Sequence, residues 1–170
     1  MTDCLDRERG EPIASLGLAP GELSILAILR HYCASFAMPE RQSWIAAISV
    51  ALSDFGDDCG PETAVAALGV LQSIRRIRRS HFRFNAADCA VCSARITGHE
   101  RLLMTALRAV RRDRGEAALA HATLLCEGND ARPVVRALAV LADRAFADCP
   151  AAAAQSAAPP SMEPAPSVGS

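Results

Sequence analysis

Two cysteines and a histidine near the middle of the chain are candidate metal ligands. Cys89 and Cys92 form a Cys-x-x-Cys pair, and His99 follows seven residues after the second cysteine. Thiolate and imidazole groups are typical ligands of zinc, and thiolates hold iron–sulfur clusters. Because the pair supplies only two ligands, the sequence predicts a metal site that is completed by residues from elsewhere in the chain.

Two sets of further ligands fit this pattern. The mixed set adds His99 and either His81 or Cys126, because both histidines fall on the inward faces of the helices expected before and after the pair. The all-cysteine set adds Cys59 and Cys126, each of which lies beside glycine at an expected helix end. The bound group would be zinc or an iron–sulfur cluster.

Two other interpretations of the cysteine pair stay open. Cys89 and Cys92 can be small buried apolar side chains, since unpaired cysteine is among the most buried residue types. They can also form a redox dithiol, although no βαβ pattern of the thioredoxin kind surrounds them. Cys33 is in line with apolar residues of the first expected helix and is assigned to the core.

Positive charge is concentrated around this motif. Residues 75–114 hold eleven arginines and three acids, whereas the whole chain has a net charge of −1. Arginine side chains bind phosphate and carboxylate groups through paired hydrogen bonds. The predicted binding face for nucleic acid or an acidic protein consists of Arg75, Arg76, Arg78, Arg79, Arg83, Arg108, Arg111 and Arg112. A solvated helix face is the simpler alternative.

Sequence motifs typical of enzymes are missing. There is no glycine-rich phosphate loop, no nucleophile elbow and no His-Glu-x-x-His, and His99-Glu100 lacks a second histidine. The aspartates are scattered, and most lie near expected helix ends, where capping explains them. The sequence therefore favours a protein that is not an enzyme.

The elements that must position these residues are helices. Apolar residues recur at helical spacing, and Pro20, Pro61 and Pro133 stand in or near first turns. Gly56 is expected to end the second helix, and residues 57–60 to form a turn. The expected helices cover about 20–36, 39–55, 61–81, 97–114, 116–126 and 129–147. We therefore predict an all-α fold, a compact bundle of five or six short helices with the Cys-x-x-Cys knuckle between the third and the fourth.

Composition divides the chain into three parts. Residues 1–18 are expected to be a flexible leader, 19–147 the helical domain, and 148–170 a disordered tail rich in alanine, proline and serine. The first residues lack the pattern of a secretory signal, and no uncharged apolar run reaches the ~20 residues that span a bilayer. We expect a cytoplasmic protein that does not enter membranes and that could form a homodimer.

Two functional hypotheses follow. In the first, zinc or an iron–sulfur cluster fixes the two arginine-rich helices, and the protein is a regulator that binds DNA or an acidic partner. In the second, the protein is a metal-free helical adaptor that binds another protein, and its cysteines are buried and inert.

Overall fold

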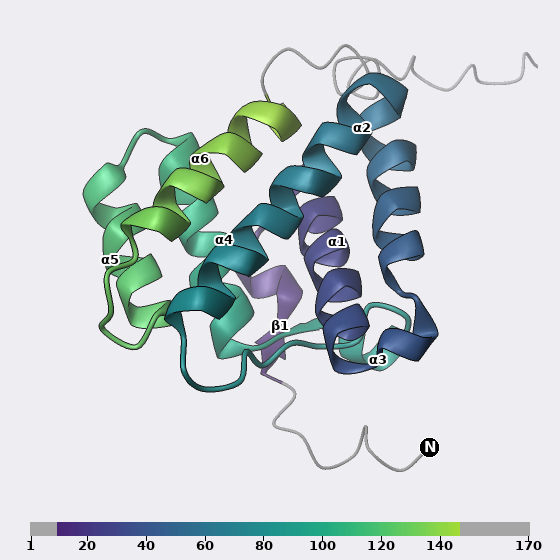
Figure 1. The fold of residues 1–170 in the computed structure, drawn as a ribbon, viewed down its shortest axis with the longest axis horizontal. Coiled ribbons are helices and arrows are strands. Elements are labelled where there is room, and N and C mark those ends of the chain that lie inside the picture. Colours follow the sequence, from purple (N-terminus) through teal and green to yellow (C-terminus); the bar gives the residue numbers. More distant parts are fainter. Residues whose placement is uncertain (1–9, 147–170) are drawn as a thin grey trace, which may run out of the picture.

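Helices make up most of the chain that the structure describes, residues 10–146 of a computed structural model (Figure 1). The elements in order are β1 (Glu11–Pro12), the 3-10 helix η1 (Ile13–Leu16), α1 (Pro20–Ala37), the 3-10 helix η2 (Pro39–Arg41), α2 (Trp44–Ile77), α3 (Ala90–Ser93), β2 (Arg95–Ile96), α4 (Gly98–Arg111), α5 (Gly115–Leu125) and α6 (Arg132–Phe146). The predicted all-α fold is confirmed, with the Cys89–Cys92 pair at α3, before α4.

Helix α1 lies in the centre of the bundle. Its residues Ile25, Leu26, Ile28 and Leu29 are all buried, and these positions lie on several sides of one helix. Burying each such side chain stabilises the fold by about 1.5–3 kcal/mol. The helix begins with Pro20 in its first turn, as expected from the sequence. A helix that is apolar on most sides is thus covered on most sides.

Helix α2 is a helical hairpin. Gly56 takes a left-handed backbone conformation, φ 77° and ψ 172°, and separates two arms of the element. The predicted break at Gly56 is therefore present, but the predicted turn at 57–60 is wrong, because the second arm begins immediately after the glycine. A single residue suffices for the reversal because glycine adopts this conformation at little cost.

The two arms of α2 meet closely near Gly60. A Cβ atom at this residue would lie 2.7 Å from the carbonyl oxygen of Ala51 and 2.9 Å from the Cα atom of Leu52. The backbones of the two arms can touch here only because the side chain is a hydrogen atom. The second arm ends at Ile77, four residues before the expected end at His81.

Helices α4 and α6 complete the core. Leu103 and Leu107 of α4 and Leu138 and Leu141 of α6 are fully buried. Figure 1 shows α6 running beside the second arm of α2 in the opposite direction, and α5 on the outer side of α4 and α6. No described helix is both long and apolar enough to cross a membrane.

Part of the expected leader is ordered. Strand β1 pairs antiparallel with β2, Glu11 opposite Ile96 and Pro12 opposite Arg95. Gly10 precedes this pair with φ 65°, and a Cβ atom there would collide with the carbonyl oxygen of Ile96. Residues 11–16, which the sequence analysis places in the leader, therefore belong to the fold. Residues 1–9 and the expected tail at 148–170 lie outside the described residues.

Candidate functional site

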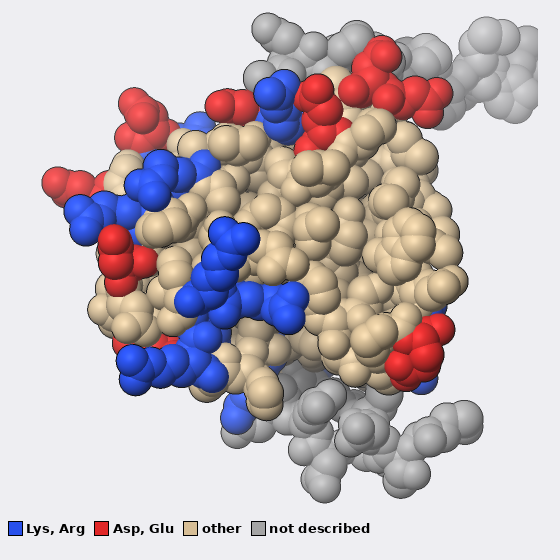
Figure 2. Space-filling model, in the orientation of Figure 1, with Lys and Arg blue, Asp and Glu red and all other residues tan. Residues whose placement is uncertain are grey.

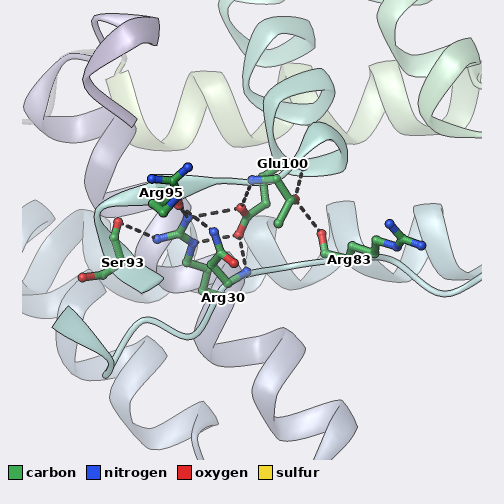
Figure 3. A network of polar contacts seen from close by, with 7 residues as sticks. Arg30, Arg83, Ser93, Arg95 and Glu100 are labelled. Carbon is green, nitrogen blue, oxygen red and sulfur yellow. Dashed lines mark hydrogen bonds and ion pairs between the residues drawn. The ribbon is translucent and has the colours of Figure 1, made fainter. Parts of the chain in front are cut away.

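A buried ion pair links α1 to the start of α4 (Figure 3). The Arg30 Nε and Glu100 Oε1 atoms lie 2.7 Å apart, and Arg30 Nη2 lies 3.1 Å from Oε2. The two side chains are only 4% and 1% exposed. The Glu100 carboxylate also accepts hydrogen bonds from the backbone N–H groups of Asn85, at 3.0 Å, and Thr97, at 2.8 Å. Four donors thus compensate for the loss of water around this charge.

Local sequence explains why Glu100 points into this site. Thr97 and Glu100 form a capping box at the start of α4, in which the Glu100 N–H donates to the Thr97 hydroxyl at 3.2 Å. The same hydroxyl donates to the carbonyl oxygen of Arg83 at 2.8 Å. The capping motif therefore turns the carboxylate back toward the chain that precedes the helix.

The network also fixes the chain around the cysteine pair. Arg30 donates to the carbonyl oxygens of Ser93, the last residue of α3, at 3.0 Å, and of Arg95 in β2, at 2.6 Å. The side-chain amide of Asn85 donates to the Arg95 carbonyl at 2.8 Å. Figure 3 shows the Ser93 and Arg95 carbonyls and the Glu100 carboxylate around the Arg30 guanidinium. Cys92, within α3, is buried, and Cys89, which precedes α3, is half-buried. The ion pair therefore holds the segment that carries both cysteines.

The two predicted histidine ligands are placed differently. His99 Nδ1 accepts from the Arg83 N–H at 2.8 Å, and Nε2 lies 3.1 Å from Nη2 of Arg78. Burial, together with the charges of Arg78 and Arg83, lowers the pKa of His99. Both ring nitrogens face protein donors, an arrangement that leaves neither directed at a metal. His81 is exposed and lies beyond the end of α2, which ends four residues before it.

The two outlying cysteine candidates also have other roles. Cys126 is fully buried at the end of α5, and burial raises the pKa of its thiol. Cys59 is disulfide-bonded, which removes its sulfur from any set of thiolate ligands. Among the described residues, no three His, Cys, Asp or Glu side chains gather in a group that could hold a metal ion. The Cys89–Cys92 pair is therefore not part of such a group within residues 10–146.

Three of the eight predicted binding arginines are used inside the protein. Arg108 and Arg111 both contact the buried carboxylate of Glu22 at the start of α1. Arg78 donates to the carbonyl oxygen of Leu125, and its Nη2 lies 3.5 Å from Oε1 of Glu127. These arginines hold helices together, which reduces the predicted binding face.

Most of the remaining basic residues lie in the last turn of α2 or soon after it. Figure 2 shows basic side chains gathered over the carboxyl-terminal part of this helix, on a face that is otherwise largely uncharged. Arg75, Arg76, Arg79, Arg83 and Arg112 are all exposed. The guanidinium of Arg75 lies over the ring of Phe36, 4.2 Å from its centroid. The stacking orients this cation beside an apolar group.

Aromatic and aliphatic side chains extend this exposed surface. Trp44, the one tryptophan of the chain, is 46% exposed, and Phe36 and Ile45 are exposed as well. The backbone N–H of Trp44 donates to the Ser35 hydroxyl oxygen at 2.7 Å. This bond brings the start of α2 next to Phe36 in the chain of α1. We call the set Phe36, Trp44, Ile45, Arg75 and Arg76 the aromatic–arginine surface. Sequence reasoning missed it because Trp44 fits the apolar spacing of the second expected helix.

A second apolar feature lies between the second arm of α2 and α6. It is a shallow groove of about 410 Å³, lined by Pro61, Val65, Val140 and the ion pair of Glu62 with Arg144. Val65 is 70% and Val140 51% exposed. The groove offers no cluster of titratable groups that resembles a catalytic centre.

Sequence reasoning also missed the Arg30–Glu100 pair. The capping box itself was visible at Thr97–Glu100, and Arg30 was visible as the one charge in an otherwise apolar stretch of the first helix. A lone arginine in a helix that is apolar on most sides signals a buried partner. Comparisons with protein-family models, with curated proteins and with solved structures give no significant match, so the geometry of the chain itself carries the functional argument.

Proposed function

We propose that the protein is a non-enzymatic helical adaptor that docks an acidic partner protein through the aromatic–arginine surface. The observations that carry the proposal are the exposed Trp44, whose backbone N–H donates to Ser35, and the stacking of Arg75 on the neighbouring residue Phe36. Tryptophan and arginine are the residues most enriched among those that dominate the energy of protein interfaces. Tryptophan is also enriched at interfaces because its ring buries a large apolar area while its N–H can form a hydrogen bond.

The composition of this surface favours a protein over nucleic acid as the partner. Nucleic-acid binding depends on many basic side chains that reach phosphates. Here Arg78, Arg108 and Arg111 already contact groups of the protein itself. The exposed Arg75 lies against an apolar ring, the arrangement expected at the edge of a hydrophobic contact. Its remaining donors suit a carboxylate of the partner.

The scaffold supports docking of a rigid surface. The buried pair of Arg30 and Glu100 connects α1 to α4 and to the chain after α2. Phe36 lies in the last turn of α1. A surface that is fixed before binding loses less conformational entropy on association. The cytoplasmic location expected from the sequence is part of this proposal. Control by zinc or an iron–sulfur cluster stays a prediction, because the described residues supply only two close cysteines for it.

Affinity purification from the source cells tests the proposal. The full chain is compared with Trp44→Ala, with Arg75→Glu and with two matched controls on other helices, Leu124→Ala and Arg136→Glu. Both control residues are exposed. We expect one protein to co-purify in defined proportion with the full chain and with both controls, and at least tenfold less of it with each surface variant, which corresponds to about 1.4 kcal/mol. Circular dichroism verifies that all variants are folded.

Binding to nucleic acid and self-association are measured in parallel. Fluorescence anisotropy with duplex DNA and duplex RNA is recorded at several salt concentrations, and the mass in solution is determined by light scattering. Tight, salt-dependent nucleic-acid binding that survives Trp44→Ala would contradict the proposal. A homodimer that Trp44→Ala dissociates would also contradict it, because the surface would then be occupied by a second copy of the chain.

A further inference from the structure

One face of the second arm of α2 changes its character along its length. Six residues that are exposed or half-buried recur at steps of four and three, the spacing that places them along one side of a helix. We call them the α2 stripe, which consists of Asp58, Glu62, Val65, Gly69, Gln72 and Arg76. The stripe is acidic near the hairpin, uncharged in its middle and basic at its end. Figure 2 shows the same order along the helix, with an uncharged area between acidic and basic side chains.

The middle of the stripe combines a protruding side chain with an open space. Val65 is 70% exposed, more than any other large apolar residue that the structure describes. A Cβ atom at Gly69, one turn further along, would meet no atom within 4 Å. Val140 of α6 lines the shallow groove together with Val65 and adds to the exposed apolar area. Another helix can therefore approach closely at Gly69, where no side chain stands in its way.

The stripe is complementary to itself when two copies of the helix run in opposite directions. An antiparallel pair that is centred on residue 67 places Val65 of each copy opposite the open space at Gly69 of the other. The same register places the carboxylate of Asp58 opposite the guanidinium of Arg76, a charge-assisted contact, at both ends of the pair. Steps of four and three residues are those at which two helices pack at a small angle.

We propose that a second copy of the chain docks on the α2 stripe and that the protein forms a symmetrical, antiparallel dimer through it. Both copies use the same residues, as in most homodimers. Glu62 and Gln72 face each other between the central and the terminal pairs, where the amide donates to the carboxylate. The antiparallel orientation also brings the positive end of each helix dipole next to the negative end of the other.

The symmetry of the stripe favours a second copy over an unrelated partner. The helix dipole explains the acid at one end and the base at the other, but it does not explain why Val65 and Gly69 lie at equal distances from the same centre. The dimer goes beyond the proposed docking of an acidic protein and does not rest on it. Phe36 and Trp44 lie outside the stripe, and Arg76 is the residue that both surfaces share.

Sedimentation velocity of the full chain at increasing concentration tests the dimer. Because the contact comes mainly from one helix of each copy, it is small, and we expect monomers in dilute protein and dimers at higher concentration. The stability of the single folded chain is therefore measured on dilute protein. A full chain that stays monomeric up to about 1 mM would overturn the proposal.

Exchanging the charges at the two ends of the stripe tests the register. Asp58→Arg and Arg76→Asp each bring like charges together at both ends, so each variant alone should dimerise about tenfold more weakly than the full chain. An equal mixture of the two variants, and the double variant, should recover the affinity of the full chain to within about threefold, because opposite charges then face each other again. Undiminished dimerisation of the single variants, or no recovery in the mixture, would overturn the register.

Further variants separate the dimer from other effects. Glu40→Arg and Arg41→Asp reverse exposed charges of η2, outside the stripe, and should leave dimerisation unchanged. Gly69→Leu fills the open space and should abolish the dimer, while circular dichroism verifies that the chain is folded. Trp44→Ala should dimerise as the full chain does, so a failure of the dimer and a failure of the proposed docking are distinguishable. A dimer that survives Gly69→Leu, that Trp44→Ala dissociates, or that the η2 variants weaken as strongly as Asp58→Arg does would overturn the proposal.

Discussion

The Arg30 guanidinium and the Glu100 carboxylate form a double contact, 2.7 and 3.1 Å, across seventy residues of sequence and almost without access to water. The pair joins the central helix to the first turn of α4 and, through the carbonyls of Ser93 and Arg95, to the chain after α3. It therefore determines where the segment between α2 and α4 lies. Each charged group of the pair is fully hydrogen-bonded. Removing either side chain therefore leaves several buried donors or acceptors without a partner.

Substituting one member of this pair should destabilise the protein strongly. For Arg30→Ala and for Glu100→Ala we expect a loss of about 3–5 kcal/mol in the free energy of unfolding, because each leaves a buried charge without its partner. Urea denaturation of the two variants and of the double variant measures this. The double variant should lose less than the two single losses added together, since neither charge then remains.

The exposed pair of Asp130 and Arg132 provides the control. Their contact of 2.9 Å has similar geometry, but both side chains are well exposed. Arg132→Ala should change the free energy of unfolding by less than about 1 kcal/mol. Equal effects of Arg30→Ala and Arg132→Ala would show that the buried pair does not hold the helices together.

Two glycines of the α2 second arm should respond oppositely to alanine. In Gly60→Ala the new Cβ would lie 2.7 Å from a carbonyl oxygen of the first arm, so we expect a loss of about 1–3 kcal/mol. Gly69→Ala adds its Cβ in open space within the same helix, where alanine should stabilise by about 0.5–1 kcal/mol. Thermal unfolding of both variants measures the difference. A stabilising Gly60→Ala would contradict the close hairpin.

The Glu127 carboxylate should make stability depend on pH at the acid end. Hydrogen bonds from the Ser80 hydroxyl, then from the backbone of Arg79 and Ser80, lower the pKa of Glu127 to about 2. A carboxyl with a lowered pKa stabilises the folded state above its unfolded value of about 4.5, and this contribution is lost as the pH falls toward 2. Glu127→Gln should therefore be less stable than the full chain at pH 7, and the difference should shrink between pH 4.5 and 2.

Urea unfolding at pH 7, 4.5 and 3 checks this dependence, with Glu40→Gln as the matched control. Glu40 is an exposed carboxylate of η2. The same measurements on Glu40→Gln show how much of the change is common to removing any exposed carboxylate. A difference for Glu127→Gln that stays constant from pH 7 to 3 would show that its hydrogen bonds do not favour the ionised form.

Metal analysis separates the adaptor from a metal-dependent regulator. We expect protein purified without added metal and without oxygen to contain well below one equivalent of zinc or iron, because the described residues include no group of three possible ligands. One equivalent of zinc per chain, lost together with stability in Cys89→Ser, would instead support the metal-binding regulator.

Helical periodicity made the bundle predictable from sequence, and specific tertiary contacts did not follow from it. The apolar spacing of residues such as Ile25 and Leu29 indicates helix and burial directly. The break at Gly56 was readable because glycine tolerates a left-handed backbone. The helix through residues 57–60 could not be predicted from the sequence, because it depends on the contact of Gly60 with the opposite arm.

The candidate site was less predictable for a physical reason. Residue type shows that arginine can bind an anion, but only the fold shows which anion is near. Arg111 pairs with Glu22, eighty-nine residues away in sequence, and Arg75 stacks on the ring of Phe36. The inward placement of His99 was expected from its helix, yet its ring nitrogens face Arg83 and Arg78. Such pairings are set by packing between helices rather than by spacing within one.

Photo-crosslinking in the source cells tests the central claim, that the aromatic–arginine surface is covered by a partner protein. A photoreactive phenylalanine derivative replaces Ile45 in the surface or, as a control, the exposed Leu124 of α5. We predict one discrete protein adduct from position 45, none from position 124, and loss of the adduct when Arg75→Glu is added. No adduct from position 45, or the same adducts from both positions, would contradict the account.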